Sequence, residues 1–182
     1  MINKITKKYS KKILQRSALN LKAGDSDMQY FMTKAPINNA LEIGTFRGIT
    51  SAFMSQYCKH LYTIDLAHGQ IQKIKGTVDW ADTEMRHDVW KYLGINNIDF
   101  IPVDNDVHKK EVVNNLDFDF AFIDGDHSYK GVKYDFEMVK KCGRVLFHDY
   151  DDNGKKCPVR DFIKSINYGN IETTKDYAYW TK

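Results

Sequence analysis

Residues 39–58 read NALEIGTFRGITSAFMSQYC. The apolar run before Gly44 predicts a buried strand, and the segment from Thr50 onward predicts a helix. Gly44 lets the chain turn tightly off the strand, and Gly48 allows a ligand to approach the backbone closely. Thr50 and Ser51 open the helix, where free N–H groups favour a carboxylate or a phosphate. This strand–turn–helix unit indicates an α/β fold with a ligand at the turn.

On both sides of this unit the chain alternates short apolar strands with helices. We expect strands at 61–66, 98–104, 119–124 and 143–149, helices at 26–33, 78–93, 107–116, 129–141 and 158–167, and a last strand pair within 170–180. Short apolar strands that alternate with helices indicate a mostly parallel sheet covered on both faces. No repeat or linker divides the sequence, so we expect one Rossmann-like α/β domain over residues 36–182.

Composition narrows the class of protein. The 182 residues are 42% hydrophobic and 28% charged, as in ordinary soluble domains. The three cysteines contain no CxxC pair, which argues for reduced thiols and against disulfides or a zinc finger. No stretch approaches the ~20 apolar residues of a membrane span, and the lysine-rich start lacks the apolar core of a signal peptide. We therefore expect a cytoplasmic protein without a membrane span.

The first 35 residues are expected to form a separate basic helical segment. Residues 1–24 hold seven of the 27 basic side chains and no acidic one. Apolar residues recur there at three- and four-residue steps, which predicts an amphipathic helix. Such a helix either packs on the domain with a solvated face or covers an anionic substrate as a flap.

Acidic residues stand at or near the ends of five successive predicted strands. They are Glu42, Asp65, Asp104, Asp124 and Asp149. Each one alone could merely cap the helix that follows it. In open α/β sheets, however, ligands bind beyond the carboxyl ends of the strands. The five residues together therefore predict a site at one edge of the sheet.

The glycine turn and Asp65 indicate which cofactor this site would bind. A dinucleotide requires the spacing GxGxxG, which the turn lacks. Glu42, just before the turn, would repel a pyrophosphate but would attract an ammonium group. S-adenosylmethionine carries an amino acid and a ribose but no phosphate, and Asp65 is spaced to hydrogen-bond a ribose diol. The charge pattern thus favours S-adenosylmethionine over NAD.

Four segments in order give the chain a family resemblance: LEIGTFRGIT, LYTIDL, FIDGDHSYKGVKYDFE and VLFHDY. Over about residues 38–167 the chain resembles class I S-adenosylmethionine-dependent methyltransferases. It is most similar to the metal-dependent group around macrocin O-methyltransferase and more distantly to the catechol type. This resemblance implies a seven-stranded sheet of order 3-2-1-4-5-7-6 whose last strand is antiparallel.

The resemblance also implies roles for individual residues. The implied cofactor contacts are Glu42, Gly44 and Thr45 for the methionine part, Gly48 and Thr50 for its carboxylate end, Asp65 for the ribose, Asp104 and Asn105 for adenine, and also Asp124. Asp124 and Asp149 would bind a divalent ion, and His127 would take the proton of the acceptor.

The residues themselves suit that chemistry. A hydroxyl is a poor nucleophile at neutral pH, so a metal that lowers its pKa or a base beside it is useful. Carboxylate oxygens are hard ligands that suit Mg²⁺. His127 could instead cap the next helix or be an exposed loop residue, and Asp126 is expected to face solvent or order the turn. Because strand residues alternate, His148 is expected on the opposite face from Asp149, in the core.

The sequence favours an O-methyltransferase acting on a sugar or small molecule. FIDGDH follows the fourth strand where amine methylases carry a Pro-Pro-aromatic motif, so nucleic acid bases are disfavoured. Either the acceptor site is open, or residues 1–35 and a second subunit of a homo-oligomer complete it. The alternatives are a non-catalytic S-adenosylmethionine-binding protein and a metal-dependent phosphohydrolase, which the Asp-Gly-Asp-His run suggests.

Overall fold

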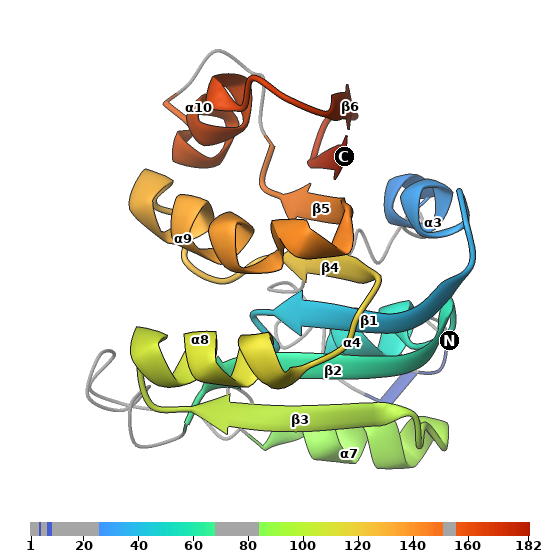
Figure 1. The fold of residues 1–182 in the computed structure, drawn as a ribbon. Coiled ribbons are helices and arrows are strands. Elements are labelled where there is room, and N and C mark those ends of the chain that lie inside the picture. Colours follow the sequence, from blue (N-terminus) through green and yellow to red (C-terminus); the bar gives the residue numbers. More distant parts are fainter. Residues whose placement is uncertain (1–3, 5–6, 9–25, 68–83, 151–155) are drawn as a thin grey trace.

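The fold is a seven-stranded sheet of order β3-β2-β1-β4-β5-β7-β6 (Figure 1). The computed structural model describes residues 4, 7–8, 26–67, 84–150 and 156–182. The strands are β1 (Ile37–Ile43), β2 (Cys58–Leu66), β3 (Ile98–Val103), β4 (Phe120–Ile123), β5 (Arg144–His148), β6 (Asn170–Thr173) and β7 (Tyr177–Thr181). β1 to β5 pair in parallel, and β7 is antiparallel to both of its neighbours. The predicted strand order and the antiparallel last strand are confirmed.

Helices cover both faces of the sheet. They are α3 (Ser26–Met32), α4 (Ile49–Met54), α7 (Met85–Leu93), α8 (Asp106–Asn115), α9 (Tyr129–Val139) and α10 (Pro158–Ser165), and a short 3₁₀ turn (Lys140–Cys142) follows α9. Apolar side chains of α3, α4 and α7 belong to one core cluster, and those of α8, α9 and α10 to a second. In Figure 1, α8 and α9 lie in front of the sheet, and α4 and α7 lie behind it.

The central strand β1 contributes side chains to both core clusters, because its side chains alternate between the two faces of the sheet. Ala40 belongs to the cluster with α3, α4 and α7, whereas Leu41 and Ile43 belong to the other. All three side chains are buried, as expected for a strand paired in parallel on both edges. This two-sided burial explains why apolar side chains occur at both odd and even positions near the end of the strand, with no strict polar–apolar alternation.

Several predicted boundaries differ from the structure. β2 begins at Cys58, before the apolar run that predicted it, because its first residues pair with β1. The last helix ends at Ser165, ahead of the predicted end at residue 167. Part of the predicted helix 78–93 and most of the basic segment 1–35 lie outside the described residues, but α3 packs its apolar side into the core. In the described part of the chain, no helix combines the length and the apolar character that a membrane crossing requires.

Gly44 is where β1 turns toward the sheet edge, and substitution by alanine is expected to destabilise the fold. Gly44 has a φ of 104°, and a Cβ there would lie 2.3 Å from the backbone oxygen of Asp124. We expect Gly44→Ala to lower the free energy of unfolding by about 2–4 kcal/mol, because backbone strain and overlap add. Denaturant unfolding followed by circular dichroism measures this change.

Gly94→Ala is the matched control. Gly94 also has a positive φ, of 69°, but a Cβ there would have nothing within 4 Å. Gly94→Ala should therefore lower the free energy of unfolding through backbone strain alone, by about 1–2 kcal/mol. Equal losses for the two variants would contradict the close approach of the turns that follow β1 and β4.

Candidate active site

The carboxyl ends of the parallel strands meet at one edge of the sheet, toward which the arrows of β1 and β3 point in Figure 1. All five acidic residues singled out from the sequence lie at this edge. Glu42 lies in β1, Asp65 in β2, Asp104 just after β3, Asp124 just after β4 and Asp149 just after β5. The edge divides into two parts, one at the ends of β4 and β5 and one at the ends of β1 and β2.

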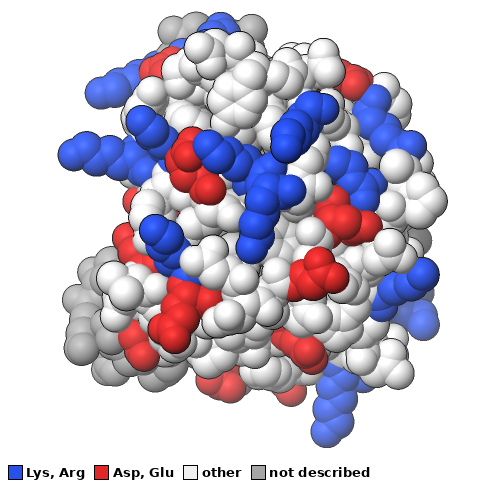
Figure 2. All heavy atoms as spheres, viewed as in Figure 1, with Lys and Arg blue, Asp and Glu red and all other residues white. Residues whose placement is uncertain are grey.

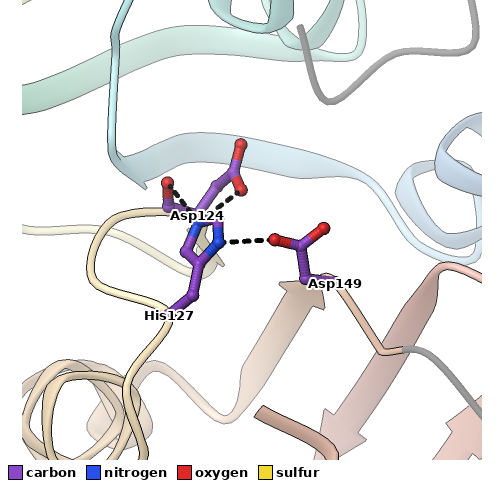
Figure 3. Close-up of side chains that lie close together, drawn as sticks. All are labelled: Asp124, His127 and Asp149. Atoms are coloured by element: carbon purple, nitrogen blue, oxygen red, sulfur yellow. Dashed lines mark hydrogen bonds and ion pairs between the residues drawn. The ribbon is translucent and has the colours of Figure 1, made fainter. Parts of the chain in front are cut away.

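At the ends of β4 and β5, His127 lies between two carboxylates (Figure 3). His127 Nδ1 is 2.5 Å from Asp149 Oδ2, and His127 Nε2 is 3.4 Å from Asp124 Oδ1. One candidate ligand atom from each of the three side chains lies within 4.8 Å of the others. The structure thus brings together the three residues to which the sequence assigned metal binding and proton transfer.

Hydrogen bonds of the backbone hold Asp124 and His127 in place. The N–H of Asp124 donates to the carbonyl oxygen of Ile43 at 2.9 Å, which fixes Asp124 beside β1. Ser128 caps α9, because its hydroxyl accepts from the N–H of Gly131 at 3.0 Å. Asp126 accepts from the N–H of Ser128 at 2.9 Å and so orders the turn. His127 therefore projects from a turn fixed at both ends, and Ser128, not His127, caps the helix.

His148 differs from its predicted position. Its ring packs near Phe122 and Tyr177, but its Nδ1 is 2.9 Å from Asp124 Oδ1 and 3.2 Å from Asp149 Oδ1. Strand alternation predicted His148 and Asp149 on opposite faces. The alternation fails because β5 ends at His148 and Asp149 has a φ of 58°, in the left-handed region. His148 is thus a fourth member of the cluster that sequence periodicity could not identify.

The two carboxylates determine the protonation of both histidines. Hydrogen bonds to Asp124 and then to Asp149 raise the pKa of His127 to about 10, although burial lowers it. The same bond from His127 holds the pKa of Asp149 below its ordinary value. Burial lowers the pKa of His148, but the bond to Asp124 and the charges of both aspartates outweigh it and raise the pKa overall. His127 is therefore a cation at neutral pH, paired with two anions.

The donor set of this cluster fits a divalent cation. Asp124 and Asp149 offer hard carboxylate oxygens, which Mg²⁺ prefers, and His127 would offer a ring nitrogen only in its neutral form. Both aspartates reach solvent, with side-chain exposures of 16% and 42%, so an ion could enter from outside. His148 Nδ1 lies within hydrogen-bond distance of Asp124 Oδ1 and would orient this carboxylate toward an ion.

At the ends of β1 and β2, Glu42 is fully buried. Its Oε2 accepts from the hydroxyls of Ser51 and Thr63, and Thr63 in turn lies 2.7 Å from the hydroxyl of Thr45. Its Oε1 has no hydrogen-bond partner among the described residues. Burial raises the pKa of Glu42 to about 8, although the bonds from Ser51 and Thr63 oppose this. A buried carboxyl with one unused oxygen is suited to a ligand that donates hydrogen bonds.

Glu42→Gln should flatten the pH dependence of stability in the ligand-free protein. Between the ordinary value of 4.5 and about 8, the folded protein retains a proton on Glu42 that the unfolded chain has lost. The free energy of unfolding should therefore fall as pH rises through this window, by at most about 1.4 kcal/mol per pH unit from this group.

Comparison of wild type with Glu42→Gln separates the contribution of Glu42 to the pH dependence of stability from that of the histidines. Glutamine keeps an oxygen for Ser51 and Thr63 but cannot titrate. Urea unfolding at several pH values from 5 to 8 measures the two slopes. The variant should show the smaller decline, and identical slopes would contradict a protonated Glu42.

Asp65 is held by the backbone of the glycine turn. The N–H of Phe46 donates to Asp65 Oδ2 at 2.6 Å, and the N–H of Leu66 donates to Oδ1 at 2.7 Å. Phe46 has a positive φ of 44°, the backbone conformation in which its N–H meets this carboxylate. Arg86 of α7, only 3% exposed, places Nη1 4.0 Å from Asp65 Oδ2. Sequence reasoning gave Arg86 no role, since one arginine in a helix carries no distinguishing pattern.

The remaining predicted cofactor contacts in the turn are buried. Thr45 and Thr50 are 2% and 6% exposed. Gly48 packs against α7, where a Cβ would lie 2.6 Å from Arg86 Cβ, and Trp90 Nε1 donates to the Gly48 carbonyl oxygen at 2.7 Å. Helix packing therefore gives a reason for glycine at 48 in addition to the ligand approach expected from the sequence.

The two residues expected near adenine lie at the start of α8. Asn105 caps this helix, because its Oδ1 accepts from the N–H of His108 at 3.0 Å. Asp104 is exposed, and its Oδ2 lies 3.4 Å from His108 Nδ1. Asp104 therefore keeps a carboxylate open to a ligand, whereas one side-chain atom of Asn105 is already used.

Comparison with known proteins gives a family and a fold. A sequence model described as "Methyltransferase domain" matches residues 41–150, which is more than half of the chain. No curated protein sequence matches the chain.

Solved structures match over most of the chain at low sequence identity. An O-methyltransferase from Bacillus cereus in complex with SAH (S-adenosylhomocysteine) is 17% identical, with 81% of this chain and 75% of that chain covered and a TM-score of 0.58. Cofactor-bound Rv0187 from MTB is 12% identical, with coverage of 85% and 78% and a TM-score of 0.62. N-methyltransferase NodS from Bradyrhizobium japonicum is 12% identical, with coverage of 85% and 90% and a TM-score of 0.51. The fold is therefore shared by O- and N-methyltransferases and does not by itself select the acceptor atom.

Proposed function

Because the chain belongs to a family of methyltransferase domains, we propose that it transfers the methyl group of S-adenosylmethionine to a hydroxyl of a sugar or small molecule, with the help of Mg²⁺. The observation that carries this proposal is the convergence of Asp124, His127 and Asp149 at the sheet edge that also holds Glu42 and Asp65. At that edge the cofactor half, at the ends of β1 and β2, lies beside the chemical half, at the ends of β4 and β5, because β4 pairs directly with β1.

The cofactor half suits S-adenosylmethionine better than a dinucleotide. The turn after β1 lacks the GxGxxG spacing, since Phe46 and Ile49 stand where its second and third glycines would be, and the buried carboxyl of Glu42 lies just before it. Glu42 Oε1, which lacks a partner among the described residues, would accept from the ammonium group of the cofactor once the carboxyl has lost its proton. Asp65 would accept from the ribose hydroxyls with the lone pairs that Phe46 and Leu66 leave open. Gly44 and Gly48, with Thr45 and Thr50, would border the methionine part.

The chemical half suits an oxygen acceptor. Methyl transfer from a sulfonium is an in-line displacement, so the protein must align the acceptor and remove its proton. Asp124 and Asp149 would hold the ion, and Mg²⁺ bound there would lower the pKa of the acceptor hydroxyl. His127 would accept the proton of the acceptor. To accept a proton, His127 must first be neutral. Its pKa must therefore fall below the raised value that Asp124 and Asp149 give it in the ligand-free protein.

The residues that follow β4 indicate which class of methyl acceptor the protein would use. The residues after β4 read DGDHS and contain no proline, unlike the Pro-Pro-aromatic segment that holds an exocyclic amine in base methylases. Magnesium and a histidine base add little for an amine, which is already nucleophilic, but they are useful for a hydroxyl. We therefore infer an alcohol acceptor, carried by a sugar or another small molecule.

Calorimetric titration with S-adenosylmethionine and with NAD, each with and without Mg²⁺, tests the proposal. We expect S-adenosylmethionine to bind and NAD not to bind. Incubation with labelled cofactor and a set of sugars, polyols and phenols should then give a Mg²⁺-dependent methyl ether. Binding of NAD alone would refute the cofactor assignment. Cofactor binding without methyl transfer to any acceptor would instead support a non-catalytic binding protein.

A further inference from the structure

A pocket of about 570 Å³ lies on the outer face of α8 and α9, away from the candidate active site. Its lining combines α8, α9, the 3₁₀ turn, the segment before β6 and the end of β7. It includes the lysines at positions 110, 140, 141 and 182, together with Glu137 and Tyr168. In Figure 2, Lys and Arg side chains gather on this face near the C-terminal end of α9.

The pocket lies at the far end of the strands from the cluster of Asp124, His127 and Asp149. The N–H of Lys182 bonds to the carbonyl oxygen of Gly143, which immediately precedes β5, whereas Asp149 follows β5. A strand of five residues spans about 17 Å. A ligand of ordinary size in the pocket therefore could not also contact the sheet edge where the chemistry is expected.

The charge of the pocket is strongly unbalanced. Among the described residues of the lining Glu137 is the one acidic residue, and it is already paired with Lys140 at 2.6 Å. Lys141 Nζ lies 3.4 Å from the carbonyl oxygen of Val113, a neutral partner. Lys110 and Lys182 have no ion pair with any residue in the described part of the chain. Like charges around one hollow create a positive potential, which an anion would neutralise.

The size and the remaining lining indicate what kind of anion fits. A volume of about 570 Å³ lies within the range of roughly 300–1,000 Å³ found for small-molecule sites, and it is small for a macromolecular surface. Ammonium groups bind phosphate as compact point charges. Tyr168 is 44% exposed, and although Lys140 Nζ lies 5.8 Å from the centre of its ring, the exposed part of the ring offers a surface on which a planar group can stack.

We propose that this pocket binds a nucleoside diphosphate, or a small molecule with the same combination of adjacent phosphates and a planar ring. Lys110 and Lys182 contact the phosphates, and Tyr168 stacks on the base. The site is separate from the methyl-transfer site and does not depend on the function proposed for it. A ligand held between α8, α9 and the end of β7 would bridge segments that are far apart in the sequence.

Titration of the full chain with UDP, inorganic pyrophosphate and uridine tests the proposal, with binding followed by calorimetry. We expect UDP to bind most tightly, pyrophosphate more weakly and uridine not measurably. Lys110→Glu and Lys182→Glu should each weaken UDP binding by at least about tenfold, because each removes a charge-assisted hydrogen bond and adds repulsion. Thermal unfolding of each variant verifies that it is folded.

Lys133→Glu is the matched control, since Lys133 is exposed on α9 but does not line the pocket. It should bind UDP within about twofold of wild type. An equal loss in all three variants, or no UDP binding to the wild type, would overturn the proposal. Displacement of UDP by S-adenosylhomocysteine would show that UDP binds at the candidate active site, and would also overturn the proposal. So would a single-stranded RNA that binds more tightly than UDP, because the surface would then serve a macromolecule.

Discussion

Asp149→Asn is expected to reduce the rate of methyl transfer by about 10²–10⁴-fold while leaving cofactor affinity within about twofold. Asparagine keeps the shape of the side chain but removes one of the two charges that would hold the ion. Stabilisation by a bound metal contributes several kcal/mol to such a reaction, and each 1.4 kcal/mol is a factor of ten in rate. Cofactor affinity should be spared because Asp149 lies beyond β5, whereas the cofactor half lies at β1 and β2.

The measurement pairs turnover of the acceptor found in the hydroxyl screen with calorimetric titration of S-adenosylhomocysteine. Asp126→Asn is the matched control: Asp126 lies in the loop between Asp124 and His127, but its carboxylate bonds Ser128 to order the turn. Asparagine retains an oxygen for that bond, so this variant should keep nearly full activity. Undiminished, metal-dependent turnover by Asp149→Asn would refute the ligand assignment.

Asp65→Ala should have the second-largest effect, on binding instead of turnover. We expect the Kd for S-adenosylhomocysteine to rise by about 10–100-fold, because the charge-assisted hydrogen bonds to the ribose diol are lost. The substitution also removes the acceptor for the N–H groups of Phe46 and Leu66 and the carboxylate that lies 4.0 Å from Nη1 of buried Arg86. A lower unfolding midpoint should therefore accompany the weaker binding.

A cofactor analogue separates the ribose contact from this structural loss. An S-adenosylhomocysteine that lacks the 2′- and 3′-hydroxyls should bind wild type much more weakly than the parent compound. The Asp65→Ala variant should discriminate far less between the two ligands, since the partner of the hydroxyls is gone. Equal discrimination by wild type and variant would show that Asp65 acts only through the turn.

Much of the architecture could be predicted from local patterns. Apolar runs such as those in β1 and β4 are short and are bounded by glycine or acidic residues, and buried parallel strands read in that way. The order of the strands came from the family resemblance, because local patterns do not specify which strands become neighbours. The start of β2 could not be predicted, since Cys58, Lys59 and His60 are not an apolar run and extend the strand by pairing alone.

Within the site, the sequence identified the carboxylates but not all of their partners. Parallel strands bring their carboxyl ends to one edge, so the positions of Asp124 and Asp149 followed from the fold. His148 could not be placed, because the change of backbone conformation at Asp149 cancels the alternation on which the prediction relied. Arg86 and Thr63 were missed because their contacts with Asp65 and Glu42 join segments that only the folded sheet brings together.

Binding of Mn²⁺, followed by the loss of its free-ion signal in electron paramagnetic resonance, most directly tests the assignment of the metal site. Mn²⁺ takes the same carboxylate ligands as Mg²⁺ and can be counted per chain. The account predicts one Mn²⁺ per wild-type chain, displaced by Mg²⁺, with binding lost in Asp124→Asn and in Asp149→Asn but retained in Asp126→Asn. Full Mn²⁺ binding by either Asp124→Asn or Asp149→Asn, or none by the wild type, would contradict it.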